Sequence, residues 1–470
     1  MLDLDIRREF EGVNLGDRRR NVRAQGLAES IARRPDAGFP SALGSEAELE
    51  AFYRLVNNPA VEPDDLGAPH RAASWRRATE YGGAILVAHD TSEFSYAGEA
   101  EREGLSRRGE HQSFHGHFAL ALAEGEAPVV HGVVGFGAHV IEDGVWLRAI
   151  PDRTFLELLV GSERWSDLAA EVRRDAPPGQ QIIHVMDREA DDYPLMTRLI
   201  RQGDDFVIRG LHDRSLMDQE GKLFSALEQT PFSISRTVTL SRRSKRRPPG
   251  SRRTHPPRDQ RPANLSIRAG RVEIKRPQGV APFGEPSMIL SVVEVVEIDP
   301  PEDATPIHWL LLSTLPVTTA EEVCRIVDIY RKRWLIEEFF KSLKTGCAAE
   351  KRQARSLWSL LNTVTLLVPI AWRLLLIRTL ASCDPTAPAA DILDEVELQA
   401  LRHLARGVKL PLKPSRQQVL LAIARIGGHL KSNGEPGWLV LGRGLERLLD
   451  FTEGWRAAMG FAAGVGGAQA

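Results

Sequence analysis

Four residues in the last third of the chain, Tyr330, Arg333, Glu337 and Lys344, have the spacing of a single helix face. At 100° and 1.5 Å per residue, a helix places all four within an arc of about 60° along about 21 Å. Cations on both sides keep the glutamate ionised, which disfavours proton transfer and suits a divalent ion beside a phosphodiester. The pattern predicts a metal- and phosphate-binding helix face, which we call the signature stripe.

Two aspartates follow short apolar runs that are typical of strands. Asp90 comes after residues 84–88, and Asp187 comes after residues 182–186. In open α/β sheets, sites assemble at the carboxyl ends of strands. Together with Glu337, these aspartates predict a triad of oxygen ligands for hard divalent ions.

Each member of this triad has a simpler alternative. An aspartate at the end of a strand is often the N-cap of the next helix, which explains Asp90 and Asp187 equally well. Acidic neighbours at positions 189, 191 and 192 are alternative ligands to Asp187, and Glu338 stands beside Glu337. Trp309, in a strand-like run before the signature stripe, fits either a packed core or a surface on which an unpaired base stacks.

Composition predicts a reduced, multidomain protein. A chain of 470 residues exceeds the usual size of one hydrophobic core. Its three cysteines, at 324, 347 and 383, are too scattered for a zinc motif or a disulfide framework. Charged residues occupy the N-terminus where a signal peptide is apolar, so we expect a cytoplasmic location. The most apolar stretch, residues 357–380, contains Pro369 and Arg373 and is predicted to be a buried pair of helices rather than a membrane span.

Charge is nearly balanced overall, with 61 Lys and Arg against 63 Asp and Glu, so local charge must indicate a partner. Residues 242–276 hold thirteen basic and two acidic residues together with five prolines, which predicts a non-helical DNA-contacting loop followed by strands. A merely solubilising loop is the alternative. A second cluster of arginines, including Arg19 and Arg20, lies on a predicted first helix and fits either a DNA-binding module or a solvated face.

Hydrophobic periodicity and capping patterns predict three regions. Residues 1–70 are expected to be helical, with Asp17 and Ser45 as N-caps and with Asn57-Asn58-Pro59 ending the helix that Ser45 opens. Residues 71–380 have α/β texture, with a β-rich insertion at about 212–305 and a helix that opens at Thr318 with Glu321. Residues 381–470 are predicted to form further amphipathic helices over 391–406, 415–426 and 441–449.

The signature stripe resembles the Tyr-Arg-Glu-Lys signature of the insertion-sequence-four family of DDE transposases. Residues 187–191 are similar to the second-aspartate motif of its transposon-five branch, and the resemblance extends to residues 15–20, 53–58, 309–312 and 423–428. One departure is Phe340, where a relative in this branch has a histidine.

The resemblance implies a fold and a set of roles. The fold is α/β, an RNase H-like catalytic core with a β-rich insertion, flanked by a helical N-terminal DNA-binding domain and a helical C-terminal dimerisation domain. The implied roles, by position in this sequence, are two Mg²⁺ or Mn²⁺ ions on Asp90, Asp187 and Glu337, phosphate contacts from Tyr330, Arg333 and Lys344, a flipped base on Trp309, and further backbone contacts from Arg209 and Lys341.

These features predict a cut-and-paste transposase that acts as a homodimer on double-stranded DNA. Metal-activated water nicks each transposon end, and the freed 3′-hydroxyl attacks the opposite strand and later the target DNA. Two alternatives are a metal-dependent endonuclease without strand transfer and a decayed protein that binds ends without cutting. No Walker loop, nucleophile elbow or His-Glu-x-x-His motif is present in the sequence.

Overall fold

A computed structural model describes residues 6–466, except for residues 36, 99–100, 109–110, 126, 150–155, 159–162, 218–220, 241–260, 281–284, 303, 353, 406, 431 and 433. The described residues fall into two compact units. The first unit comprises residues 1–164, 170–180 and 334–470, and the second comprises residues 165–169 and 181–333. The chain therefore passes from the second unit to the first between Arg333 and Trp334.

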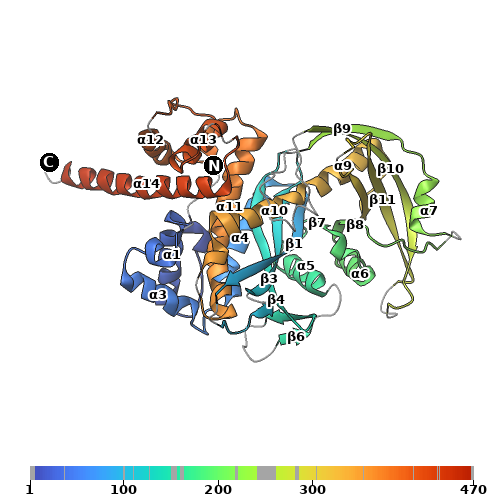
Figure 1. The fold of residues 1–470 in the computed structure, drawn as a ribbon, viewed down its shortest axis with the longest axis horizontal. Coiled ribbons are helices and arrows are strands. Elements are labelled where there is room, and N and C mark those ends of the chain that lie inside the picture. Colours follow the sequence, from blue (N-terminus) through green and yellow to red (C-terminus); the bar gives the residue numbers. More distant parts are fainter. Residues whose placement is uncertain are drawn as a thin grey trace. The chain divides into compact units, whose positions relative to one another are not determined.

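The N-terminal part of the first unit is helical, as predicted (Figure 1). Asp17 caps the first long helix by accepting a hydrogen bond from the Arg19 amide at 2.6 Å. Ser45 caps a later helix through the Glu48 amide, and that helix ends before Asn57, also as predicted. The elements are η1 (Arg8–Phe10), α1 (Arg18–Arg33), α2 (Phe39–Ala42), α3 (Glu46–Val56) and α4 (Pro63–Tyr81).

The sheet of the first unit is antiparallel and has the strand order β6-β5-β4-β3-β1, with β2 paired to β3. Its three long strands are mostly buried, because helices cover them. Helix α4 packs on β4, and the long apolar helix described below packs on α4 and β4. The strands are β1 (Ile85–Ala97), β2 (Ser106–Arg108), β3 (His111–Ala123), β4 (Val130–Glu142), β5 (Val145–Ala149) and β6 (Leu156–Leu158).

Helix α11 (Leu357–Cys383) is a single helix of 27 residues, so the predicted pair of helices is wrong. Pro369 lies inside it without ending it. Its length and composition would suit a membrane span, but its most apolar window of 18 residues is completely buried within the protein. This helix is therefore the central core helix of the first unit. Its predicted burial is confirmed.

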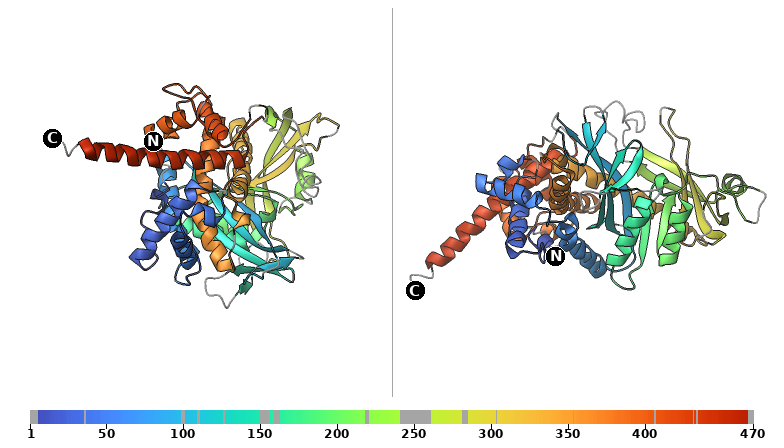
Figure 2. Two further views of the ribbon diagram at one scale, coloured as in Figure 1. Left: turned by 60° about the vertical axis from the view of Figure 1, so that its left-hand side comes forward. Right: turned by 90° about the horizontal axis from the view of Figure 1, so that it is seen from below.

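The C-terminal helices follow α11 in the first unit. Ser415 caps α13 (Arg416–Ile426) as predicted, whereas α12 (Glu395–Leu404) begins at Glu395 with Asp394 as its cap instead of near residue 391. Helix α14 (Trp438–Gly466) is much longer than predicted, and its end projects beyond the other C-terminal helices in all views (Figures 1 and 2). The predicted domain boundaries at residues 70 and 380 stay predictions; they fall inside α4 and α11.

The second unit contains a mixed sheet with the strand order β7-β8-β12-β11-β10-β9. Strands β7 and β8 are parallel, and the remaining pairs are antiparallel. A buried core that includes Met186, Phe206 and Leu312 lies between this sheet and its helices. The elements are β7 (Ile182–Met186), η2 (Arg188–Ala190), α6 (Tyr193–Gln202), β8 (Asp205–Arg209), α7 (Leu223–Glu228), β9 (Ile234–Leu240), β10 (Arg261–Lys275), β11 (Ser287–Ile298), β12 (His308–Ser313) and α9 (Ala320–Lys332). Helix α5 (Glu163–Asp175) contributes residues to both units.

The β-rich insertion is confirmed, because α7 and strands β9 to β11 occupy residues 223–298. The strands predicted after the basic loop, over residues 265–267 and 271–274, belong to the one long strand β10. Residues 242–260, which carry eight of the thirteen basic residues predicted to contact DNA, lie outside the described residues. The helix predicted to open at Thr318 begins one residue later, with Thr319 and Glu322 forming the capping box.

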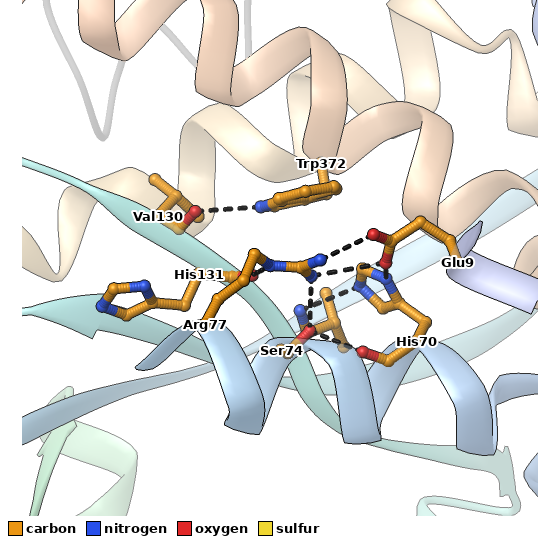
Figure 3. Close-up of polar contacts among 8 residues, drawn as sticks. Glu9, His70, Ser74, Arg77, Val130, His131 and Trp372 are labelled. Carbon is orange, nitrogen blue, oxygen red and sulfur yellow. Dashed lines mark hydrogen bonds and ion pairs between the residues drawn. The ribbon is translucent and has the colours of Figure 1, made fainter. Parts of the chain in front are cut away.

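A buried polar network attaches η1 to α4 and β4 (Figure 3). The His70 ring accepts a hydrogen bond at Nε2 from the Val133 amide at 3.2 Å, so its proton is on Nδ1, which lies 2.5 Å from the Glu9 carboxylate. Burial lowers the pKa of His70, and Glu9 only partly offsets this. His70 is therefore a neutral donor to Glu9.

Arg77 completes this network. Its guanidinium donates to Glu9 at 2.6 Å and to the His131 carbonyl at 2.7 Å, and it lies 3.9 Å from the centre of the Trp372 ring in α11. Burial alone would raise the pKa of Glu9, but His70 and Arg77 outweigh it and lower the pKa. The N-terminal segment is thus held by a charge pair buried among α4, β4 and α11.

Candidate active site

Asp90 lies within strand β1 and not at its carboxyl end, so the predicted strand end is wrong. The strand continues to Ala97, because Phe94 and Tyr96 resume the inward alternation after a short polar stretch. Asp90 is partly buried, and its carboxylate accepts a hydrogen bond from the Thr91 amide at 2.8 Å.

The face of the sheet on which Asp90 lies is the face covered by helix α10 (Trp334–Lys341). Asp90 is directly opposite Phe118 on β3, and residues directly opposite share a face. The Phe118 ring lies 5.6 Å from the rings of both Phe339 and Phe340 in α10. Asp90 therefore shares a sheet face with the helix that carries Glu337.

The signature stripe is not on one regular helix, which corrects the prediction. Helix α9 ends at Lys332, Arg333 forms a turn, and α10 begins at Trp334. The next turn, η3 (Ser342–Gly346), is π-helical, and its wider winding displaces Lys344 from the angle that a regular helix gives. Tyr330 and Arg333 consequently belong to the second unit, and Glu337 and Lys344 belong to the first.

The structure distinguishes Glu337 from its neighbour. Glu338 is 8% exposed and forms an ion pair with Lys341, whose ammonium also lies 4.2 Å from the centre of the Trp334 ring. Glu337 is partly exposed on the same helix. Glu338 is thus more buried than Glu337 and is committed to its pair with Lys341, which favours the more accessible Glu337 as the metal-binding candidate.

Lys344 is held by a residue that sequence reasoning missed. Its ammonium lies 3.2 Å from the Glu350 carboxylate and donates to the Glu93 carbonyl. Glu350 also accepts from the Ser95 amide of β1 at 3.1 Å. Nothing in the sequence indicated that Glu350 would reach Lys344, because the chain changes direction at Ala348. Ala348 is a non-glycine residue in the left-handed region, with φ 51°, and local sequence patterns do not predict this conformation.

In the second unit, Asp187 directly follows β7, as predicted, and it also caps η2 through the Glu189 amide at 2.9 Å. The alternative ligand Asp191 is buried and binds Arg214 together with the amides of Leu211 and His212. Asp191 therefore has a structural role, which is to hold the backbone of residues 211–214 in place.

The remaining alternatives near Asp187 differ from it as well. Asp192 caps α6 through the Leu195 amide at 3.1 Å, and Glu189 is exposed on η2. Asp187 is thus the one acidic residue of this stretch that sits directly at the end of β7, which favours it as the ligand.

Five predicted site residues gather at one edge of the second unit. Tyr330 is 7% exposed, and its ring meets the Trp309 ring edge-on at 5.3 Å. Burial raises the pKa of Tyr330, while the charges of Arg333 and Arg209 lower it and that of Asp187 raises it. All three charged side chains are therefore close enough to act on the phenol.

Strand directions explain this gathering. Arg209 ends β8, which runs parallel to β7, so it lies at the same edge as Asp187. Strand β12 runs antiparallel to β8, so Trp309 near its start lies at this edge too. The Arg209 guanidinium donates to the His308 carbonyl at 3.0 Å, which fixes it beside Trp309. Trp309 is partly exposed, so it is not a fully buried core residue.

Arg19, one of the two predicted DNA-contacting arginines of α1, lines an open groove in the first unit, and Arg20 does not. Arg19 is exposed, whereas Arg20 donates to the Leu15 carbonyl at 3.0 Å and supports the entry of the helix. The groove has a volume of about 590 Å³ and is lined by Arg18, Arg19, Val22, Arg23, Gly26, Leu27, Glu29, Ser30, Arg33, Glu48 and Ala51.

Two known protein families match this chain. The model described as Transposase DNA-binding matches residues 6–61, and the model described as Transposase DDE domain matches residues 162–371. The chain therefore contains a transposase DNA-binding domain and a DDE transposase domain. The first match contains the arginines of α1, and the second contains Asp187, Glu337 and the whole signature stripe, so DNA is a partner of this transposase. Asp90 lies between the two matched segments.

A DDE transposase domain uses divalent metal ions, and carboxylates are the ligands that such hard ions prefer. The candidate ligands of this transposase are divided, with Asp90 and Glu337 in the first unit and Asp187 in the second. Over the part of the chain that the structure describes, no group of three or more His, Cys, Asp or Glu side chains is arranged to hold a metal ion. The convergence of the three carboxylates stays a prediction.

Proposed function

We propose that this protein is a cut-and-paste transposase of the insertion-sequence-four family, in its transposon-five-like branch, acting in the cytosol as a homodimer on transposon ends. It hydrolyses a phosphodiester at each end and then transfers the freed 3′-hydroxyl through a hairpin intermediate. The observation that carries the proposal is the cluster of Asp187, Arg209, Trp309, Tyr330 and Arg333 at one edge of the second unit.

That cluster has the composition of a site for a DNA strand end. A carboxylate, two guanidinium groups and a phenol can bind a metal ion and phosphate oxygens, because guanidinium groups pair with phosphate in a bidentate manner. A partly exposed indole next to them offers a flat surface to an unstacked base. Charged groups and a partly exposed indole are not the residues that form a hydrophobic core.

In the proposed mechanism, Asp90, Asp187 and Glu337 would hold two Mg²⁺ or Mn²⁺ ions. When bound, the ions lower the pKa of a water molecule and polarise the phosphoryl group. Arg333 and Lys344 orient the phosphate oxygens, and the Tyr330 hydroxyl donates a hydrogen bond to one of them. Trp309 holds the displaced base while the hydroxyl attacks the opposite strand.

The test compares Glu337→Gln with the matched control Glu338→Gln, using a duplex that carries the terminal repeat of the element that encodes the protein. Glu337→Gln should abolish Mg²⁺-dependent nicking and leave the dissociation constant for the duplex within about threefold of the original. Glu338→Gln should still nick, although it loses its pair with Lys341. Normal nicking by Glu337→Gln would refute the assignment.

Pre-cleaved ends with a free 3′-hydroxyl separate a transposase from a nuclease. Joining of these ends to plasmid DNA supports the proposal, whereas cutting without joining indicates an endonuclease, and binding without cutting indicates a decayed protein. Trp309→Ala should lower the yield of hairpin products about tenfold while the first nick is retained, and Trp309→Phe should restore part of the yield. Equal hairpin yields for all three proteins would remove Trp309 from the mechanism.

A further inference from the structure

Arg352 is a buried arginine that the proposed chemistry does not use. It is 2% exposed, it follows η4 (Ala349–Lys351), and it lies eight residues beyond Lys344. Removing a guanidinium from water is costly unless several acceptors surround it. The groups that surround Arg352 must therefore offset the cost of its burial.

The guanidinium of Arg352 joins two segments that are far apart in the sequence. It donates to the carbonyls of Pro35 and Ala37, which lie between α1 and α2, and to the Cys347 carbonyl at 2.8 Å. It also lies 4.6 Å from the centre of the Phe39 ring, the first residue of α2. One side chain thus binds the region after the arginine-bearing helix and the residue that closes the π-helical turn.

The first segment belongs to the DNA-binding match, and the second carries a residue with a proposed role on DNA. Pro35, Ala37 and Phe39 lie inside the match to the transposase DNA-binding family. Cys347 ends the turn that carries Lys344, and its amide donates to the Ser342 carbonyl at 2.9 Å. Arg352 therefore connects the DNA-binding module to the end of the signature stripe.

We propose that Arg352 is a positioning residue that couples the DNA-binding module to the segment of residues 342–347. When the module binds a transposon end, Arg352 fixes where the backbone of that end meets Lys344, and so determines which phosphodiester is cut. Lysine is a poor substitute, because a single ammonium has no rigid fork with which to reach carbonyls on both segments. The nicking measurement of this proposal rests on the proposed function, whereas the hydrogen-exchange measurement requires only that the protein binds DNA.

The matched control is Arg373 in α11. It is 3% exposed and is also held in the first unit, but its partner is Glu397 at 2.9 Å in α12, away from the DNA-binding module. Arg352→Met and Arg373→Met each remove one buried guanidinium and retain a side chain of similar length. Loss of stability alone would affect both variants in the same way, so the temperature is set where circular dichroism shows both to be folded.

The first measurement maps nicks at single-nucleotide resolution on the terminal-repeat duplex with Mg²⁺. Arg352→Met should bind the duplex within about threefold of the original affinity, nick at least about tenfold more slowly and distribute its nicks over neighbouring positions. Arg352→Lys should be intermediate, and Arg373→Met should nick at the original position. Nicking by Arg352→Met at the original position and rate would overturn the proposal.

The second measurement needs no cutting and therefore separates this proposal from the proposed function. Hydrogen exchange of the amides of residues 342–347 is followed with and without the terminal-repeat duplex, in the absence of metal. Binding should slow exchange there in the original protein and in Arg373→Met, but not in Arg352→Met. If the duplex protects this segment equally in all three proteins, Arg352 does not couple the two segments, whether or not the protein cuts DNA.

Discussion

Four buried histidines should make the first unit lose stability as the pH falls below about 6.5. Burial lowers the pKa of His89 and of His139 to about 3 and that of His131 to about 4, and nearby arginines add to the effect on the last two. Burial also lowers the pKa of His117 well below its usual 6.5, with help from the charges of neighbouring histidines and Arg164.

The direction of this pH effect depends on whether the folded or the unfolded chain binds protons first as the pH falls. As the pH falls, the histidines of the unfolded chain take up protons near pH 6.5, whereas the folded chain keeps these four neutral down to about pH 4. Protonation therefore favours unfolding, and the stability that is complete above pH 6.5 is lost below it. Each group costs about 1.4 kcal/mol between pH 7.5 and 5.5. Together they cost about 5 kcal/mol, which is comparable with the whole stability of a typical domain.

Urea unfolding at pH 7.5, 6.5 and 5.5 and constant ionic strength measures this loss by far-ultraviolet circular dichroism. His131→Gln removes one titrating group at a site 3% exposed and should reduce the loss of stability between pH 7.5 and 5.5 by about 1.4 kcal/mol. A free energy of unfolding that changes by less than about 1 kcal/mol over this range would refute the reasoning.

Three substitutions test the other assignments. Glu9→Gln should lower the free energy of unfolding by about 3 kcal/mol, because it leaves a buried guanidinium without its carboxylate, whereas the exposed Glu11→Gln should change it by less than about 0.5 kcal/mol. Asp187→Asn should abolish Mg²⁺-dependent nicking and leave the melting temperature unchanged, since asparagine also caps helices. Asp191→Asn should lower the melting temperature, because it weakens the pair with Arg214. The opposite pattern would exchange the roles of the two aspartates. Gly132→Ala should destabilise the fold by at least about 2 kcal/mol in urea titrations, because its φ is 142° and a Cβ would lie 2.0 Å from a hydroxyl oxygen of α4; a milder loss would show that β4 and α4 can separate.

Local patterns predicted the elements whose boundaries depend on local chemistry. Strand β7 was predicted over its exact range, and the cap at Asp17 and the end of α3 at Asn57 were also correct. An apolar run bounded by polar residues, or a side chain within reach of an unpaired amide, decides such features without help from the rest of the fold.

The errors have tertiary causes. Strand β1 continues through Asp90 because β3 pairs with it along all thirteen of its residues, and a window centred on the apolar run does not contain that partner. The signature stripe is divided between two assigned helices at Arg333, whose dihedral angles stay helical, and the backbone departs from regular winding at residues 342–346. Helical periodicity predicted which residues belong together in the site, but it assumed one rigid helix to hold them.

Charge pairing explains how a chain with nearly equal numbers of acidic and basic residues binds a polyanion. Lys341 and Lys344 of the first unit are each held by a glutamate, and Arg236 of the second unit is held by Asp328 at 2.9 Å. A phosphate that contacts such a cation replaces a carboxylate and gains less than it would from an unpaired one, which weakens binding to arbitrary DNA. Tight binding then depends on DNA whose phosphates match several of these positions at once.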